Sequence, residues 1–417
     1  MKMRMMVTAF CCMVMAVAHA QTETMRQVVD RGLRVATSQA LLLAKNGESR
    51  RKMLPQNFDG KQLHFCSPAA WVSGFFPGVL WYLYENASQQ HSPQEATLLA
   101  YAKDYTHRVD TAQWITSNHD VEFMVNCSFG NGLRFTGDPY YKQVMIQAAK
   151  SLSTRFNKRI GCIKSWETKK GKWQYPVIID NMLNLELLTE ASKLSGDATY
   201  KNMAVSHATV TMKNHFRPDF SCYHVVSYDT ISGKPHAKNT HQGYADESAW
   251  ARGQAWALYG YTMMYRETGN KKFLQQAVNV GRYIAKRLPE DFVPYWDFDD
   301  PRLTGKHMDH ERAQFYLQHT PVPRDASAAA VYASAYLELS QYVNKKEGKT
   351  FRLLGENILR SLSSPTYLAK SGEQGGFILK HSTGNLGKNS EVDVPLSYAD
   401  YYYVEALMRW KKLFGNQ

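Results

Sequence analysis

The chain has 417 residues and a formal net charge of +13, with 44% hydrophobic and 12% aromatic residues. A basic balance favours an anionic partner. The sequence has neither a dense Lys/Arg cluster nor a nucleic-acid-binding motif, so we expect no nucleic acid as a partner.

The first twenty residues have the pattern of a secretory signal peptide. Lys2 and Arg4 give a basic start, residues 5–17 are almost wholly apolar, and Ala18-His19-Ala20 supplies the cleavage signal. The alternative is a membrane anchor, but about thirteen apolar residues are fewer than the roughly 20 that span a bilayer. We expect an exported, periplasmic protein that begins at Gln21. Cleavage removes two basic residues and leaves a net charge of +11, with no membrane contact.

Four cysteines follow this segment: Cys66, Cys127, Cys162 and Cys222. Four cysteines in a chain of this length do not make a disulfide scaffold, and their spacing gives neither a CxxC pair nor a zinc pattern. We expect buried free thiols, with a single disulfide as the alternative.

Helical periodicity dominates the chain, and strand-like alternation is scarce. Clear helical runs cover residues 95–109, 141–152, 182–194 and 351–362. The last run, residues 396–413, is amphipathic and rich in aromatic residues.

A short repeat predicts helical hairpins. Each copy follows one helical run and precedes another, and the three copies are Thr136-Gly137-Asp138, Ser195-Gly196-Asp197 and Thr268-Gly269-Asn270. Glycine can end a helix, and Asp or Asn can cap the next one. About twelve helices of usual length make six hairpins, which either stack as an open superhelix or close into a toroid. The long polar loops and the aromatic last helix favour closure, so we predict an all-α (α/α)6 barrel in one domain, residues 21–417.

Two aspartates occupy equivalent places in successive hairpins. Asp120 follows Asn118-His119 and precedes an apolar stretch, and Asp180 follows the apolar run Val177-Ile178-Ile179. For both, helix capping is the alternative to a catalytic role. Desolvation raises the pKa of a carboxyl, so Asp180 could hold a proton near neutral pH as a general acid must. In a closed toroid both aspartates reach one mouth, and glycoside hydrolysis commonly uses two carboxylates.

The segment 240–256 is the densest in polar and aromatic residues. We expect Asp246 to cap a helix there. The large or polar side chains that stand among small residues in this segment are Trp250, Arg252, Gln254 and Trp256. They suit sugar binding, because Trp stacks on sugar rings, Gln bonds hydroxyls and Arg binds carboxylate or sulfate. Close helix packing through the small residues between them is the alternative.

Other chemistry has little support in the sequence. His224 lies in the β-like segment 223–228, where a structural role is the more common one for a lone histidine. No HExxH, clustered His/Cys or EF-hand pattern occurs, so we predict no catalytic metal and no cofactor.

In combination these motifs resemble the unsaturated glucuronyl hydrolases, glycoside hydrolase family 88. The resemblance extends from Trp71-Val-Ser-Gly-Phe-Phe-Pro-Gly78 to Ser397-Tyr-Ala-Asp-Tyr-Tyr402. Its other motifs are His119-Asp120, Ile179-Asp180-Asn181-Met182, the segment 240–256, Pro294-Tyr-Trp-Asp-Phe298 and Arg324-Asp-Ala-Ser-Ala-Ala329.

The resemblance implies an (α/α)6 barrel with Asp180 as general acid/base and Asp120 as its assistant. The residues that it implies for substrate contact are His119, His224, Gln242, Trp250, Arg252, Trp256 and Trp71.

The family removes the 4,5-unsaturated uronic acid that lyases leave at the end of small anionic oligosaccharides. The resemblance implies that Asp180 protonates C4 of this enol ether and that water then adds at C5. Chondroitin, hyaluronan, heparin and plant or algal uronides are all candidate sources. The rivals are an unsaturated rhamnogalacturonyl hydrolase on a similar barrel and a non-catalytic glycan-binding protein, which has no need for both aspartates.

Overall fold

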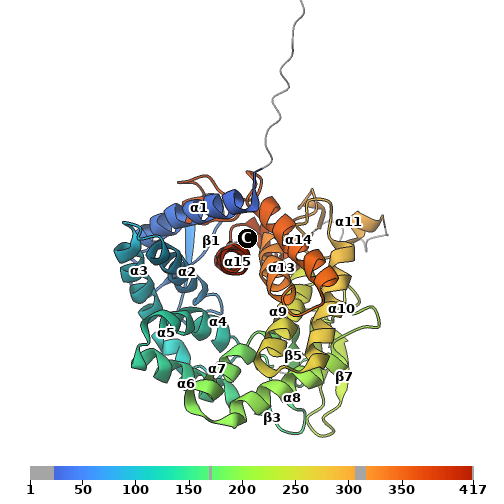
Figure 1. Ribbon diagram of the computed structural model, residues 1–417. Helices are drawn as coiled ribbons and strands as arrows, with labels where there is room; N and C mark the ends of the chain where they lie inside the picture. Colours follow the sequence, from blue (N-terminus) through green and yellow to red (C-terminus); the bar gives the residue numbers. More distant parts are fainter. Residues whose placement is uncertain (1–22, 169–170, 306–315, 416–417) are drawn as a thin grey trace, which may run out of the picture.

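The computed structural model describes residues 23–168, 171–305 and 316–415. The expected signal peptide, residues 1–20, lies outside them. Within these ranges, helices form two concentric rings (Figure 1). The inner ring consists of α2 (Phe75–Gln89), α4 (Val121–Val125) with α5 (Asn131–Thr136), α7 (Leu185–Ser195), α9 (Ala251–Thr268), α13 (Ala326–Leu339) and α15 (Ser397–Phe414). The outer ring consists of α1 (Met25–Asn46), α3 (Glu95–Arg108), α6 (Pro139–Ser153), α8 (Ala198–Asn214), α10 (Lys271–Arg287) and α14 (Lys345–Leu362).

The ring closes through its last helix, because α15 packs against both α2 and α13. The prediction of a closed (α/α)6 barrel is therefore confirmed. Burial separates the two rings: all residues of α13 are buried, whereas α10 buries one face only. A helix that is apolar all round belongs inside a core, and an amphipathic helix belongs at its surface.

The predicted hairpin repeat is also confirmed. Its glycines end α5, α7 and α9 in the left-handed region, with φ of 64° at Gly137, 77° at Gly196 and 67° at Gly269. The residue after each glycine caps the next helix with its side chain; these residues are Asp138, Asp197 and Asn270.

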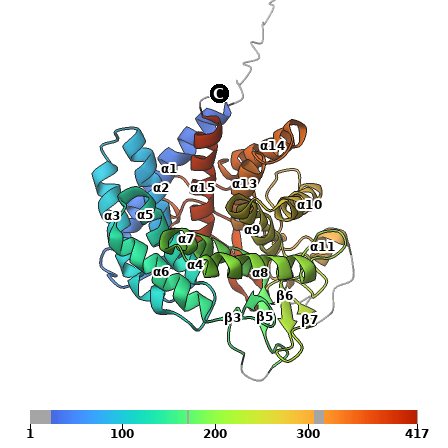
Figure 2. The same cartoon turned by 60° about the horizontal axis from the view of Figure 1, so that its bottom comes forward.

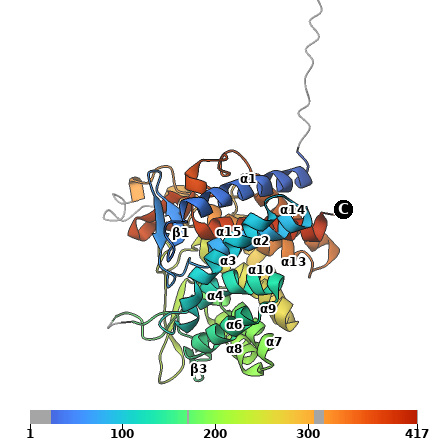
Figure 3. The same cartoon turned by 90° about the vertical axis from the view of Figure 1, so that its left-hand side faces the viewer.

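Short antiparallel strands lie at one end of the helical rings (Figures 2 and 3). The pairs are β1 (Leu54–Phe58) with β2 (Leu63–Cys66), β3 (Phe156–Asn157) with β4 (Cys162–Ile163), and β8 (Ser382–Asn385) with β9 (Ser390–Val394). A three-stranded sheet has the order β5 (Pro176–Ile178), β6 (Val225–Tyr228), β7 (Pro235–Asn239). A short helix, α11 (Pro301–Thr304), lies outside the rings.

The four described cysteines are free and buried, as expected. No helix among the described residues is both long enough and apolar enough to cross a membrane.

Candidate active site

Asp180 lies where the small sheet meets the inner ring. Strand β5 pairs with β6, and the amide of Ile179 donates to the carbonyl of His224 (3.0 Å). The chain then turns into the 3-10 segment Ile179–Met182, which holds Asp180 ahead of α7. This pairing brings Nε2 of His224 to 3.6 Å from Oδ2 of Asp180.

Asp120 lies on the loop before α4. Its amide donates to Oδ1 of Asn118 (2.9 Å), and the amide of His119 donates to the carbonyl of Ser165 (3.0 Å). Nε2 of His119 lies 3.3 Å from Oδ1 of Asp120. The carboxyl of Asp120 makes no capping hydrogen bond to α4, and Asp180 lies inside its turn rather than at the cap. Asp120 therefore stands at the N-cap position of α4 without capping it through its side chain, and Asp180 is not a cap.

The two carboxyls are held without a basic partner. Among the described residues, neither forms an ion pair with Arg or Lys. Burial raises the pKa of Asp180 to about 7; the field of Arg252 opposes this shift, and the charge of Asp120 adds to it. Burial likewise raises the pKa of Asp120 to about 7, against the field of Arg155. Near neutral pH, a carboxyl at this site can therefore carry a proton, as a general acid requires.

The histidine beside Asp180 is neutral. Burial holds the pKa of His224 well below its usual value, and the nearby His241 lowers it further. Its Nδ1 accepts from the backbone amides of His241 (3.3 Å) and Gln242 (3.2 Å). The proton of the neutral ring is therefore on Nε2, so an N–H faces Asp180.

The start of α9 forms an aromatic wall behind this histidine. The ring of Trp250 stacks on His224 with centroids 4.5 Å apart and an interplanar angle of 24°. Gly253 makes room for it, because a Cβ there would come within 2.9 Å of the Trp250 ring. The expectation that Asp246 caps this helix is wrong. The helix begins at Ala251, and the Asp246 carboxylate instead accepts from the preceding loop, at the side-chain amide of Asn239 and the backbone amide of Thr240.

Arg252 is almost fully buried and joins three elements of the barrel. Its guanidinium pairs with Asp325 at the start of α13 (2.7 Å) and donates to the carbonyls of Thr383 (2.6 Å) and Gly384 (2.5 Å) in β8. The side chain of Gln242 also donates to the carbonyl of Gly384 (3.1 Å). Both side chains thus hold β8 over the site, while the charge of Arg252 acts on Asp180.

The two remaining predicted tryptophans complete the site. Trp256 packs against Phe123 (5.5 Å between centroids), and its indole acts to lower the pKa of Asp180. Trp71 packs against Phe123 at 5.7 Å and Tyr398 at 4.8 Å. The structure therefore brings all nine predicted site residues together around one mouth of the barrel.

Tyr398 is a site residue that the sequence reasoning missed. Its ring lies between Trp71 and the guanidinium of Arg252, which is 5.4 Å from the ring centroid. The signal was present, because Tyr398 belongs to the motif Ser397–Tyr402 that carries the family resemblance.

Among the buried polar atoms that have no hydrogen-bond partner in the described part of the chain, four lie around Asp180. They are Oδ2 of Asp180, Nε2 of His224, Nε1 of Trp256 and the hydroxyl of Tyr398. An unpaired buried polar atom costs about 1–3 kcal/mol, and native proteins keep few of them. Their convergence on one carboxyl is typical of a site shaped to bond a ligand.

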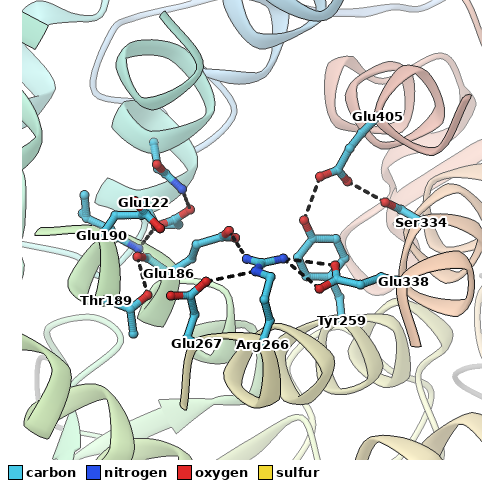
Figure 4. Close-up of polar contacts among 12 residues, drawn as sticks. Glu122, Glu186, Thr189, Glu190, Tyr259, Arg266, Glu267, Ser334, Glu338 and Glu405 are labelled. Carbon is cyan, nitrogen blue, oxygen red and sulfur yellow. Dashed lines mark hydrogen bonds and ion pairs between the residues drawn. The ribbon is translucent and has the colours of Figure 1, made fainter. Parts of the chain in front are cut away.

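A separate cavity of about 1430 Å³ opens at the other end of the barrel. It is lined by α7 along its length, by the C-terminal parts of α9 and α13, and by α15 after its first turn, and the lining includes Glu122 of α4. None of the nine predicted residues lines it. Figure 4 shows Arg266 there, placed between glutamates of facing helices.

The donor set gives no metal site in the part of the chain that the structure describes. No group of three or more His, Cys, Asp or Glu residues there is arranged to hold a metal ion.

Comparison with known proteins defines the class. No protein-family model matches the chain. An unsaturated glucuronyl hydrolase of Formosa agariphila is 46% identical over 84% of this chain and 82% of its own length. The structure of an unsaturated glucuronyl hydrolase specific for heparin matches with a TM-score of 0.82 and 45% identity, over 92% of this chain and 98% of that one. A variant of the Streptococcus agalactiae enzyme, solved with dGlcA-GalNAc6S, matches with a TM-score of 0.74 and 27% identity, over 94% and 93% of the two chains.

Fold, site and relatives together define an (α/α)6-barrel glycosidase. The chain belongs to the unsaturated glucuronyl hydrolase family. Such an enzyme releases the terminal 4,5-unsaturated uronic acid from anionic oligosaccharides produced by lyases.

Proposed function

We propose that the nine residues at this mouth perform the reaction, with Asp180 as general acid/base and Asp120 as its assistant. The observation that carries this proposal is the group of unpaired buried atoms around Asp180. Two of them are the N–H groups of His224 and Trp256, which can only donate. They can stabilise the carboxylate that remains when Asp180 gives up its proton.

The proposed reaction is hydration of the C4=C5 enol ether. The protonated carboxyl of Asp180 donates its proton to C4, which places positive charge on C5 and the ring oxygen. Water adds to C5 and returns a proton to the Asp180 carboxylate, so one residue serves as acid and then as base. The hemiketal at C5 opens to a ketone, and the hemiacetal left at C1 releases the remaining sugar.

The role of Asp120 follows from its charge and its position. Burial raises the pKa of Asp180, and the negative charge of the Asp120 carboxylate raises it further. The proton of Asp180 therefore stays available near neutral pH. Asp120 can also accept from a ring hydroxyl of the substrate.

The other predicted residues suit the binding of the uronate ring. Trp250 and Trp71 offer apolar ring surface, and the guanidinium of Arg252 supplies positive charge for the uronate carboxylate. His119, His224, Gln242 and Trp256 supply polar groups around the ring.

The relatives support a glycosaminoglycan-derived disaccharide as the substrate. The heparin-specific neighbour is 45% identical and the neighbour with bound dGlcA-GalNAc6S is 27% identical. We therefore expect heparin-type unsaturated disaccharides to be turned over faster than chondroitin-type ones. A panel of both, followed by loss of the ultraviolet absorbance of the double bond, ranks them directly.

The bond attacked is tested in deuterated water. Hydration places deuterium at C4 of the released keto acid and leaves saturated glucuronides intact. Displacement at the anomeric carbon gives a product without deuterium at C4 and cleaves saturated glucuronides. Either of these two results contradicts the proposed reaction.

The N-terminal pattern supports export to the periplasm, with residues 1–20 as signal peptide and residues 21–417 as one catalytic domain. N-terminal sequencing of the protein from the periplasmic fraction checks this proposal, because the mature chain is expected to begin at Gln21.

A further inference from the structure

Both histidines of the site turn the same ring nitrogen toward an aspartate, but different groups bond their other ring nitrogen. Each directs Nε2 toward a carboxyl, at 3.3 Å for His119 and 3.6 Å for His224. Backbone amides hold the other nitrogen of His224. The other nitrogen of His119 lies 2.9 Å from Nδ2 of Asn184, a fully buried side chain at the start of α7.

A backbone carbonyl fixes which end of the Asn184 amide meets the imidazole. Nδ2 of Asn181 donates to the carbonyl of Ile163 (2.9 Å) and to Oγ of Ser165 (3.0 Å). A carbonyl can only accept, so Oδ1 of Asn181 must be the end that faces Asn184, at 3.3 Å. The Asn184 atom between them is therefore the nitrogen.

The opposite orientation of Asn184 is unfavourable. It would bring two amide oxygens to within 3.3 Å of each other, with no hydrogen between them. In the observed orientation Oδ1 of Asn184 is buried without a partner, which costs stability. The observed orientation has this cost, and it directs an N–H of the Asn184 amide at Nδ1 of His119.

We propose that Asn184 is a positioning residue that locks His119 in its Nε2–H tautomer, so that the ring turns an N–H toward Asp120 and cannot take its proton. The proposal rests on the catalytic role of Asp120 given above. With its lone pair occupied at Nδ1, His119 is a donor only. The carboxyls are then the groups at this mouth that exchange protons with the substrate.

The surroundings of His119 keep the ring neutral. Burial lowers the pKa of His119 to about 3, and the positive charge of Arg155 lowers it further, against the opposing effect of the Asn181 side chain. The other titratable groups that act on this ring are Asp120, His207 and His224. Neither neighbouring imidazole is charged near neutral pH, because burial lowers the pKa of both.

The test replaces the donor by an acceptor of the same shape. In Asn184→Asp the new carboxyl accepts from Nδ1, which moves the ring proton away from Asp120 or adds a second proton. We expect kcat to fall about 10- to 100-fold, the usual effect of losing an outer partner that orients an imidazole, while KM changes much less. Nitrogen-15 NMR of labelled histidine should show the His119 signals, assigned with His119→Gln, changing from Nε2–H to Nδ1–H or to imidazolium.

A matched control makes the same substitution elsewhere. Asn131 is also buried and donates through Nδ2 to the carbonyl of Cys127 (2.9 Å) and the hydroxyl of Tyr401 (3.1 Å). Asn131→Asp should leave kcat and the His119 signals unchanged. Asn184→Leu, which removes the donor without adding charge, should also lower kcat and release the tautomer.

The outcomes separate this inference from the proposed function. An Nδ1–H tautomer in the unsubstituted enzyme, or folded Asn184 variants with unchanged kcat and His119 signals, would overturn the role of Asn184. If Asp120→Asn and Asp180→Asn retain full turnover, the catalytic assignments themselves fail, whatever the Asn184 variants do.

Discussion

The two ends of the barrel surround their buried carboxyls with different partners. At the mouth where the inner helices begin, Asp120 and Asp180 face neutral imidazoles, and burial raises the pKa of both to about 7. At the other end, burial also acts to raise the pKa of Glu338, but Arg409 and Arg266 outweigh it and lower the pKa. Pairing with two arginines thus holds Glu338 as an anion, whereas Asp120 and Asp180, which have no arginine or lysine partner among the described residues, are available for proton transfer.

The charged network at that second end connects facing helices. Arg266 on α9 bonds Glu186 on α7, Glu267 on its own helix and Glu338 on α13 (Figure 4). Arg409 on α15 bonds Glu338 and Glu405.

Glu122 and Glu186 are exceptions at this end of the barrel, because burial raises the pKa of Glu186 to about 7 in spite of the opposing charge of Arg266. Glu122 has no arginine partner among the described residues. Its oxygens accept from the side chain of Asn126 (2.7 Å) and the amide of Leu187 (2.6 Å), and burial raises its pKa.

The largest expected effect comes from removing the acid. Asp180→Asn should lower turnover about 10²- to 10⁴-fold, the range for loss of a general acid/base, because an amide cannot deliver a proton to C4. The fold should persist, since no cation loses its partner. Glu186→Gln, at the other end, is the control and should leave turnover per folded molecule unchanged. A folded Asp180→Asn enzyme with near-normal loss of ultraviolet absorbance would remove Asp180 from the mechanism.

For the charged network around Arg266 we expect the reverse result, a loss of stability without a loss of turnover. Arg266→Met should lower the free energy of unfolding by about 3 kcal/mol, because removing one partner of a buried ion pair leaves uncompensated charge. Three glutamates lose a bond in this variant. Urea unfolding measures the loss, and turnover of the folded fraction should not change. Loss of turnover without loss of stability would mean that the two ends are not separate in function.

The sequence predicts the fold better than it predicts the difference between the two ends of the barrel. Periodicity and the glycine repeat identify most helices, because both signals are local. The error at Asp246 has a local cause too: its carboxylate bonds the loop before it, and the helix starts five residues later. The pairing of β5 with β6, which places His224 beside Asp180, joins segments far apart in the chain. So does the bond from Asn184 to His119. Contacts of this kind have no local signature.

The pH dependence of turnover should reflect the titration of the Asp120 and Asp180 carboxyls. Asp180 must be protonated to act as an acid, and its pKa is raised to about 7, so turnover should fall as pH rises through neutrality. The two aspartates interact, and the observed midpoint belongs to the pair. In Asp120→Asn the like charge is gone, which lowers the pKa of Asp180 and moves the fall to lower pH. Glu186→Gln should leave the midpoint in place. Residual turnover of Asp120→Asn that falls at a higher pH than in the unsubstituted enzyme would contradict this sign.

The smallest effect concerns the charge of the whole molecule. The net charge of the chain without residues 1–20, +11, should attract an anionic sugar over a distance, and screening shortens that reach to about 8 Å at physiological ionic strength. Arg252 acts from a buried position, and salt screens buried charges less. We therefore expect added salt to lower kcat/KM a few-fold at most, through the rate of encounter, and to leave kcat unchanged. A monosulfated substrate should show a steeper dependence than its unsulfated counterpart, because it carries one more charged group. Equal slopes for the two substrates, or kcat/KM that stays flat from low to high salt, would confine the electrostatic contribution to the buried contacts around Arg252.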